Sequence, residues 1–163
     1  MANRLSRYVA KINFAPRKLR SFLLTKLFCS QVKFANTAGV KLLTVSHNEV
    51  RLKLANKKRV QNHIGGIHAV AAALLAESAT GLILGINLPD SRLPLLKSMT
   101  LNYYKRMQGD LSAKASLTNE QITQIQQHEA GDIIITVELT DESEQQPIVC
   151  QMQWAWIAKQ PKR

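Results

Sequence analysis

The chain has 163 residues, of which 45% are apolar and 20% charged, a composition typical of one globular domain with a single core. Its two cysteines, Cys29 and Cys150, exclude a disulfide framework and favour free thiols in a reducing compartment, so a cytoplasmic location is expected. The net charge of +11 is uneven: residues 1–60 carry fourteen Lys and Arg with one acid, and the remaining 103 residues carry eight with ten. This asymmetry indicates either an anionic partner on the N-terminal side or a solvated basic face, and charge alone does not separate the two.

Two short amphipathic helices are predicted before residue 35. In residues 3–13 apolar side chains recur at helical spacing, and Pro16 suits the first turn of a second helix with the stripe Leu19, Phe22, Leu23 and Leu27. The apolar runs are short and interrupted by Lys and Arg, so no signal peptide is expected. Such a stripe usually docks on its own domain, and we predict that residues 1–35 form a basic amphipathic arm packed on the rest. Contact of this arm with a membrane surface is the alternative.

Alternating apolar and polar residues predict six strands after the arm. These strands are expected at residues 40–46, 49–55, 95–107, 111–117, 133–140 and 148–157. The first two form a hairpin, and a loop with two prolines occupies residues 87–94. A capping box at residues 118–121 opens a polar helix that runs to about residue 129.

Residues 67–84 form a long apolar segment that follows a glycine pair and predicts one helix ending at Gly85. Its only readily ionisable side chains are His68 and Glu77. A membrane span is not expected, because alanines partition weakly and a carboxylate at mid-segment is costly in lipid. A helix that is apolar on all sides must be enclosed. We therefore predict an α+β fold in which one antiparallel sheet wraps around this long central helix, with residues 36–160 as that domain.

The order of elements and several short motifs resemble the hotdog fold. N-x-x-G-x-x-H opens the central helix at residues 62–68, and L-x-E-x-A follows at residues 75–79. These motifs are similar to those of small hotdog acyl-CoA thioesterases of the phenylacetate-catabolism type. The resemblance is closest to a bacterial thioesterase-like family catalogued as a domain of unknown function, through V-Q-N-H-I-G-G at 60–66, L-L-A-E at 74–77, Q-G-D at 108–110 and W-A-W at 154–156. It covers residues 16–159, nearly the whole chain.

This resemblance implies a homodimer whose two sheets join edge to edge. Its active sites would lie between the helix start of one subunit and the carboxylate-bearing helix of the other. Asn62 and Glu77 have the fifteen-residue separation of the family's catalytic pattern. The chain departs from that pattern in one place, because His68-Ala69-Val70 replaces the common H-G-G. The bulk of Val70 would narrow the approach to the helix start.

Thioester hydrolysis requires a nucleophile and a group that holds the oxyanion. Glu77 would act as general base on water or attack the carbonyl carbon directly. The oxyanion would bind to free amides at the helix start, and we expect the N–H of Gly66 or Ile67 in this role. Gly65 and Gly66 would let the ligand come close to the backbone.

Two further residues of the motif have candidate roles. Asn62 would orient the water or the carbonyl, and His68 would shape the loop or assist proton transfer. Each candidate also has a structural interpretation: Asn62 caps the loop, His68 is a buried and satisfied histidine, the glycines serve only the turn, and Glu77 is a buried acceptor. Basic residues near the helix start and on the third strand are candidates for binding the phosphates of coenzyme A, and these are Lys57, Lys58, Arg59, Lys105 and Arg106.

The sequence thus predicts a bacterial acyl-CoA thioesterase with a helix-borne carboxylate at a dimer interface. The alternative is a non-catalytic hotdog protein that binds an acyl ligand or a membrane surface. The four histidines lack zinc-like spacing, so no metal is expected, and no cofactor is expected apart from the coenzyme A thioester as substrate. The expected partners are a small acyl thioester and a second copy of the chain, as a dimer or a dimer of dimers. Nucleic-acid binding is not expected, because no base-reading motif or aromatic platform accompanies the basic run.

Overall fold

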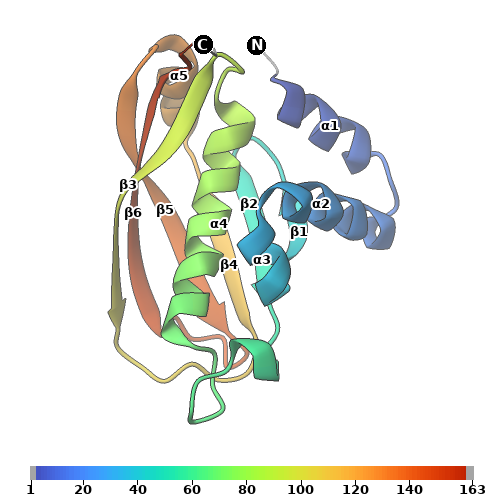
Figure 1. The fold of residues 1–163 in the computed structure, drawn as a ribbon, viewed down its shortest axis with the longest axis vertical. Coiled ribbons are helices and arrows are strands. Elements are labelled where there is room, and N and C mark those ends of the chain that lie inside the picture. The colour runs from blue at the N-terminus through green and yellow to red at the C-terminus, as the bar shows by residue number, and fades with distance from the viewer. Residues whose placement is uncertain (1–2, 161–163) are drawn as a thin grey trace.

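The computed structural model describes residues 3–160 and consists of a curved sheet with helices on one side (Figure 1). The helices are α1 (Arg4–Asn13), α2 (Arg17–Gln31), α3 (Lys33–Ala38), α4 (Ala69–Asn87) and α5 (Asn119–Gln127), with one 3-10 turn, η1 (Lys58–Val60). The strands are β1 (Lys41–Val45), β2 (Glu49–Leu54), β3 (Arg92–Tyr103), β4 (Leu111–Ser116), β5 (Gly131–Asp141) and β6 (Ile148–Ala158). The predicted succession of hairpin, long helix and four strands is confirmed, whereas α3 and η1 were not predicted.

The six strands form one antiparallel sheet in the order β1-β2-β4-β5-β6-β3. Side chains alternate across it as the sequence predicts, since Leu111, Ala113 and Ala115 of β4 are buried and the residues between them are not. The buried face packs on α4, whose alanines let the sheet approach closely. The predicted α+β arrangement of a sheet wrapped around one long helix is therefore confirmed.

The central helix extends further than predicted. Gly85 does not end it, because α4 continues to Asn87. The side-chain amide of Asn3 donates to the carbonyl oxygens of Gly85 (2.7 Å) and Leu88 (2.6 Å), so the end of the helix is satisfied by the arm and needs no glycine cap. By length and hydropathy α4 could cross a membrane, but 61% of it is buried inside the fold, as expected of a core helix.

The edge strand β3 lies at different residues from those predicted. It begins at Arg92 and ends at Tyr103, so Pro94 is inside the strand, and Lys105 and Arg106 follow it in a loop. Proline lacks an N–H and is tolerated on an edge strand, where that position needs no partner. Its outer edge is unpaired within residues 3–160, because the strand order ends there.

The arm helices pack on the domain, α1 through Val9 and α2 with only part of its predicted stripe, since Leu27 contacts the core. Leu24 of α2 is buried, whereas Leu19 and Phe22 of the predicted stripe are exposed. The reason lies in the edge of the sheet, where β1 needs hydrogen-bond partners. Thr25 Oγ1 accepts from the N–H of Leu42 (2.9 Å), and the Ser21 hydroxyl donates to the carbonyl of the same residue. These two hydroxyls determine how α2 is rotated against the sheet.

Candidate functional site

The turn before α4 is organised by Asn62. The side-chain oxygen of Asn62 accepts from the backbone N–H groups of Ile64 and Gly66, both at 3.1 Å. The backbone N–H of Asn62 donates to the carbonyl oxygen of Gly66 (2.8 Å). Gly65 adopts a positive φ of 77°, which favours glycine. Asn62 therefore caps the loop, as its structural interpretation proposed, and the N–H of Gly66 is already engaged.

His68 is the N-cap residue of α4. Its Nδ1 accepts from the N–H of Val70 (3.1 Å), which assigns the ring proton to Nε2, and the side chain is exposed rather than buried. The interpretation of His68 as a buried histidine is therefore wrong. The N–H of Ile67 has no acceptor within residues 3–160, although Ile67 itself is fully buried. Of the two predicted oxyanion donors, the N–H of Ile67 is therefore the one that lacks an acceptor in the described chain, and it is not exposed to solvent.

A cavity of about 350 Å³ lies beside this helix start, between α3, η1 and the first turns of α4. Its walls include Phe34, Arg59, His68, Val70 and Leu74. Arg59 Nε donates to the carbonyl of Ala38 (3.2 Å), so this side chain is part of the wall. Val70 is 57% exposed and stands at the cavity, in the place where the related thioesterases were expected to have glycine.

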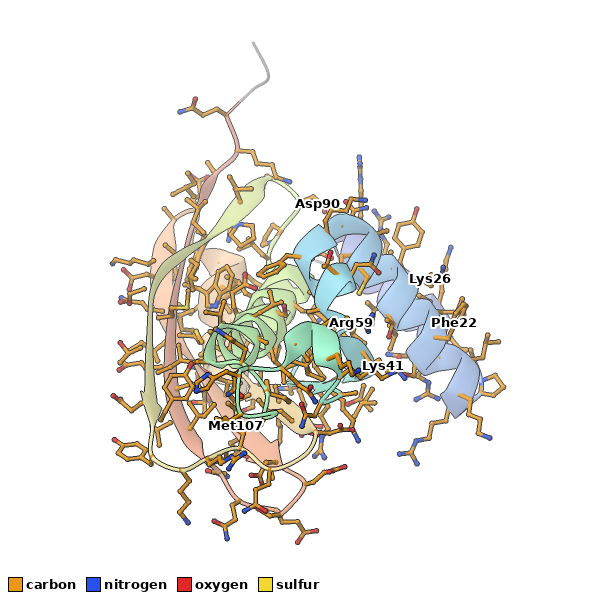
Figure 2. All side chains as sticks on the ribbon, turned by 60° about the horizontal axis from the view of Figure 1, so that its bottom comes forward. Phe22, Lys26, Lys41, Arg59, Asp90 and Met107 are labelled. Atoms are coloured by element: carbon orange, nitrogen blue, oxygen red, sulfur yellow. The ribbon has the colours of Figure 1, made fainter. Side chains whose placement is uncertain are left out.

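The predicted phosphate-binding cations gather at the end of the molecule where α4 begins. Lys57, Lys58 and Arg59 are exposed on and before η1. The loop after β3 lies at the same end (Figure 1), and there Arg106 donates to the carbonyl of Ile64 (2.8 Å) while Lys105 Nζ donates to Gln145 Oε1 (2.7 Å). Figure 2 brings this end forward, with Arg59 and Met107 labelled.

Glu77 lies on the third turn of α4, nine residues beyond His68. At 1.5 Å per residue this is a distance of about 13 Å along the helix. The carboxyl lines a second cavity of about 260 Å³, which is mostly apolar and lies between α4, the inner sides of α1 and α2, and the start of β3. The lining includes Leu5, Phe28, Pro94 and Trp154. The carboxyl is therefore not sealed in the interior.

No cation pairs with Glu77 in the described part of the chain. Burial raises the pKa of Glu77, with a weaker opposing effect from the Ser78 hydroxyl beside it. Ser78 is 2% exposed, lines the same cavity, and has no hydrogen-bond partner at normal distance among residues 3–160. A carboxyl without a cation and the buried hydroxyl of Ser78 beside it thus meet in one apolar cavity, an arrangement that is costly for stability alone.

The two cavities open along one face of α4. Val70, Leu74, Glu77 and Gly81 follow helical spacing on this face, which is only partly covered within the chain. Glu77 and the helix start of one chain cannot reach the same small group, because about 13 Å of helix separates them. The expectation that two subunits contribute to one site stays a prediction.

A comparison of the sequence with known families places residues 20–157 in the family described as Domain of unknown function (DUF4442). The chain belongs to the DUF4442 family. Among curated proteins, none matches the sequence.

Solved structures similar to this DUF4442 chain share its fold. One is PA5026 from Pseudomonas aeruginosa, a protein of unknown function described as a probable thioesterase, with a TM-score of 0.76, 24% identity, and coverage of 84% of this chain and 95% of that one. Another is the thioesterase HI1161 from Haemophilus influenzae, with a TM-score of 0.68, 15% identity, and coverage of 83% and 88%. At such identities the likeness establishes the fold, so the predicted hotdog fold is confirmed, and the family match confirms the predicted membership in a family catalogued as a domain of unknown function.

Several residues of the DUF4442 site were not found from the sequence. Gly81 faces the indole ring of Trp154, from which an added Cβ would lie only 2.8 Å away. Trp154 Nε1 donates to Thr80 Oγ1 (2.9 Å), so the first tryptophan of the W-A-W motif is a fixed wall of the Glu77 cavity. A glycine in the middle of an apolar helix was the only sequence signal of this close contact.

The geometry gives little support to metal-ion chemistry or to a cysteine nucleophile. No cluster of three or more His, Cys, Asp or Glu side chains suited to a metal ion occurs within residues 3–160. Burial raises the pKa of Cys150 to about 11, so this thiol stays protonated and is a poor nucleophile near neutral pH.

Proposed function

We propose that this DUF4442 protein hydrolyses acyl thioesters, with Glu77 as the catalytic carboxylate. The observation that carries the proposal is an unpaired carboxyl in an apolar cavity that remains open to solvent. Such a group lowers stability, and a cost of this kind is typical of functional sites. A pKa raised by burial also makes Glu77 a stronger base than an exposed glutamate.

The reaction is the addition of water to the thioester carbonyl. Glu77 accepts a proton from water while the water oxygen bonds to the carbonyl carbon, and the carbonyl oxygen becomes an oxyanion. The intermediate then collapses, the carbon–sulfur bond breaks, and the proton on Glu77 passes to the leaving thiolate. Direct attack by Glu77 to give an anhydride is the variant of this chemistry.

The oxyanion would bind at the start of α4. The N–H of Ile67 is its proposed donor, aided by the positive end of the helix dipole. Because Ile67 is fully buried, the turn at Gly65 and Gly66 would have to move aside for the substrate to reach this N–H. Asn62, whose side chain holds the turn through Gly66, is then a positioning residue. The exposed Nε2–H of His68 lies at the same helix start, where it is suited to contact the substrate.

A second copy of the chain is part of the proposal, because about 13 Å of helix separates Glu77 from His68, the residue after Ile67, within one copy. The open edge of β3 is the proposed site of pairing, supported by its unpaired backbone and by exposed apolar side chains next to it, Val70, Met99 and Tyr103. Exposed apolar surface beside an unpaired edge strand is typical of an interface.

Coenzyme A is the proposed carrier. Lys57, Lys58, Arg59, Lys105 and Arg106 lie at the end of α4 where a ligand would enter, and Lys and Arg side chains bind phosphates through charge-assisted hydrogen bonds. The acyl chain would occupy the apolar cavity beside Glu77. At about 260 Å³ this cavity exceeds the roughly 150 Å³ of an engineered apolar cavity that binds benzene. The proposed setting is the bacterial cytoplasm, where free thiols persist.

The test is hydrolysis of a panel of acyl-CoA esters with short to long acyl chains, measured as release of the free thiol. Wild type is compared with Glu77→Gln and Glu77→Ala, and with Glu138→Gln, which removes an exposed carboxyl from β5. We expect hydrolysis by wild type and the Glu138 variant, and loss of it in both Glu77 variants. Undiminished hydrolysis by Glu77→Ala would remove Glu77 from the mechanism.

A non-catalytic acyl-binding role is the second candidate, favoured by the exposed Val70 at the helix start and by the engaged N–H of Gly66. Both features restrict access to the proposed oxyanion site. Calorimetric binding of acyl-CoA without turnover of any ester in the panel would support this role over hydrolysis.

A further inference from the structure

The outer side of the arm combines exposed aromatic and aliphatic side chains with cations. Phe14, at the corner between α1 and α2, is 92% exposed, and Phe22 on α2 is 57% exposed. Figure 2 shows Phe22 and Lys26 on the outer side of α2, away from the sheet. We call this surface the outer arm face, and its members are Arg4, Arg7, Tyr8, Lys11, Phe14, Leu19, Phe22 and Lys26.

The cations of the outer arm face are not balanced by acids of the arm. Arg4, Arg7 and Lys11 lie on one side of α1 around Tyr8, where they line a groove of about 390 Å³. Residues 1–48 contain no Asp or Glu. Asp90 is the acid that meets α1, and its carboxylate accepts from the backbone N–H of Arg4 at 3.0 Å and 3.2 Å. The guanidinium and ammonium groups of this side therefore face solvent.

The apolar members are exposed because α2 already packs with another face. Leu24 fills the contact with the domain, so Leu19 and Phe22 stay exposed in the part of the chain that the structure describes. Lys26 Nζ lies 5.8 Å from the centre of the Phe22 ring, which brings charge and apolar surface together at one point. A solvated basic face would not require exposed phenylalanine side chains.

We infer that the outer arm face binds an anionic lipid surface, with Phe14 and Phe22 inserted among the acyl chains and the cations at the head groups. Amphipathic helices with basic and aromatic residues bind membrane interfaces in this way. The geometry favours lipid over nucleic acid, because a phosphate backbone would use the cations and leave Phe14 and Leu19 in water. Binding to a lipid surface would use both the cations and the exposed apolar side chains.

This contact is compatible with the rest of the molecule. Figure 1 shows α1 and α2 on the opposite side of the molecule from most of β3, so the outer arm face remains free if two copies pair through β3. The inner side of the same helices lines the Glu77 cavity through Leu5, Leu27 and Phe28. The inference does not depend on hydrolysis, since no residue of the outer arm face takes part in the proposed chemistry.

The test is cosedimentation of the full chain with vesicles of phosphatidylcholine alone and of an equal mixture with phosphatidylglycerol. We expect binding to the anionic vesicles only, weakened by salt. Each cation near an anionic surface contributes about fivefold in partitioning, so Arg7→Gln with Lys11→Gln should weaken binding by about 25-fold. Phe14→Ser with Phe22→Ser should remove the part of the binding that persists at high salt.

Matched controls separate the outer arm face from bulk properties. Lys97→Gln with Lys114→Gln makes the same change in net charge on exposed parts of the sheet, and Ile134→Ser removes an apolar side chain that is 47% exposed. Both controls should bind as wild type does, and circular dichroism should show all variants folded. Equal binding by arm variants and controls, or no binding to anionic vesicles, would overturn the inference. Binding of a single-stranded oligonucleotide that depends on Arg7 and Lys11 but not on Phe14, with vesicles unbound, would also overturn it.

Discussion

Replacing Glu77 with glutamine tests whether the carboxyl serves chemistry or structure. Glutamine keeps the size and shape of the side chain and removes only its charge and basicity. No ion pair is broken, because none forms at Glu77 within residues 3–160. A general base contributes about 10²- to 10⁴-fold to a rate, so kcat/KM should fall by that factor, or by about 3 to 5 kcal/mol in transition-state stabilisation.

The same substitution should leave the fold intact. At acidic pH, where the Glu77 carboxyl is protonated and neutral like glutamine, the stability of the variant should fall within about 0.5 kcal/mol of wild type, which for a chain of this size is about 1 to 2 °C in Tm. The sign of the stability difference between the variant and wild type depends on pH. Burial raises the pKa of Glu77 in the folded state, so the stability from its protonated form is present below the unfolded-state pKa and is lost as pH rises through the folded-state pKa. The stability of the Gln variant relative to wild type should therefore increase as pH rises.

The assay pairs thiol release from acyl-CoA with thermal unfolding between acidic and neutral pH, both on purified full-length chain. A large loss of rate with an almost unchanged Tm would assign Glu77 to catalysis. Two results would refute the reasoning: a rate within threefold of wild type, or a Tm lowered by many degrees at neutral pH, which would mean that the carboxylate is a structural acceptor.

Four substitutions test the surrounding structure. Asp141→Asn should destabilise by about 1 to 3 kcal/mol. Although burial alone would raise the pKa of Asp141, its hydrogen bonds from Ser143, Gln108 and Gln145 lower it, so its contribution is present above the unfolded-state pKa and lost as pH falls through the folded-state pKa, which Tm against pH will show. Gly81→Ala should cost about 1 to 3 kcal/mol, because its Cβ would lie 2.8 Å from the Trp154 ring; indole fluorescence and urea unfolding measure the displacement, and an unchanged spectrum and midpoint would contradict it. Leu24→Ala should cost about 2 to 5 kcal/mol and Leu19→Ala less than about 0.5, since Leu24 is 1% and Leu19 is 49% exposed; equal urea midpoints would show that α2 does not pack as described.

Much of the fold follows from local patterns. Alternation along 111–117 predicts β4 because a half-buried strand must place every second side chain inside. Thr118 and Gln121 predict the start of α5, and both bonds of their capping box form. The motif around Asn62 likewise indicated the turn and the helix start, since both depend on residues close together in sequence.

Features that depend on distant contacts were not accessible in this way. The sequence of α2 offers two apolar faces, and a helical wheel cannot choose between them. The choice followed from the unpaired edge of β1, where Ser21 and Thr25 bind the backbone of Leu42. The end of α4 beyond Gly85 depended on Asn3, more than eighty residues away in the chain.

By itself, the amino-acid sequence determined most of the helices and strands, though not α3, η1 or the bounds of β3. It also determined that an apolar helix must be enclosed by a sheet and that Glu77 is the one acid in that helix. Only the tertiary structure decided that this carboxyl opens into a cavity without a partner, with Ser78 beside it and Trp154 as a wall. The physical reason is that periodicity reports which side of an element is buried, whereas cavities and unpaired groups depend on what other elements leave uncovered.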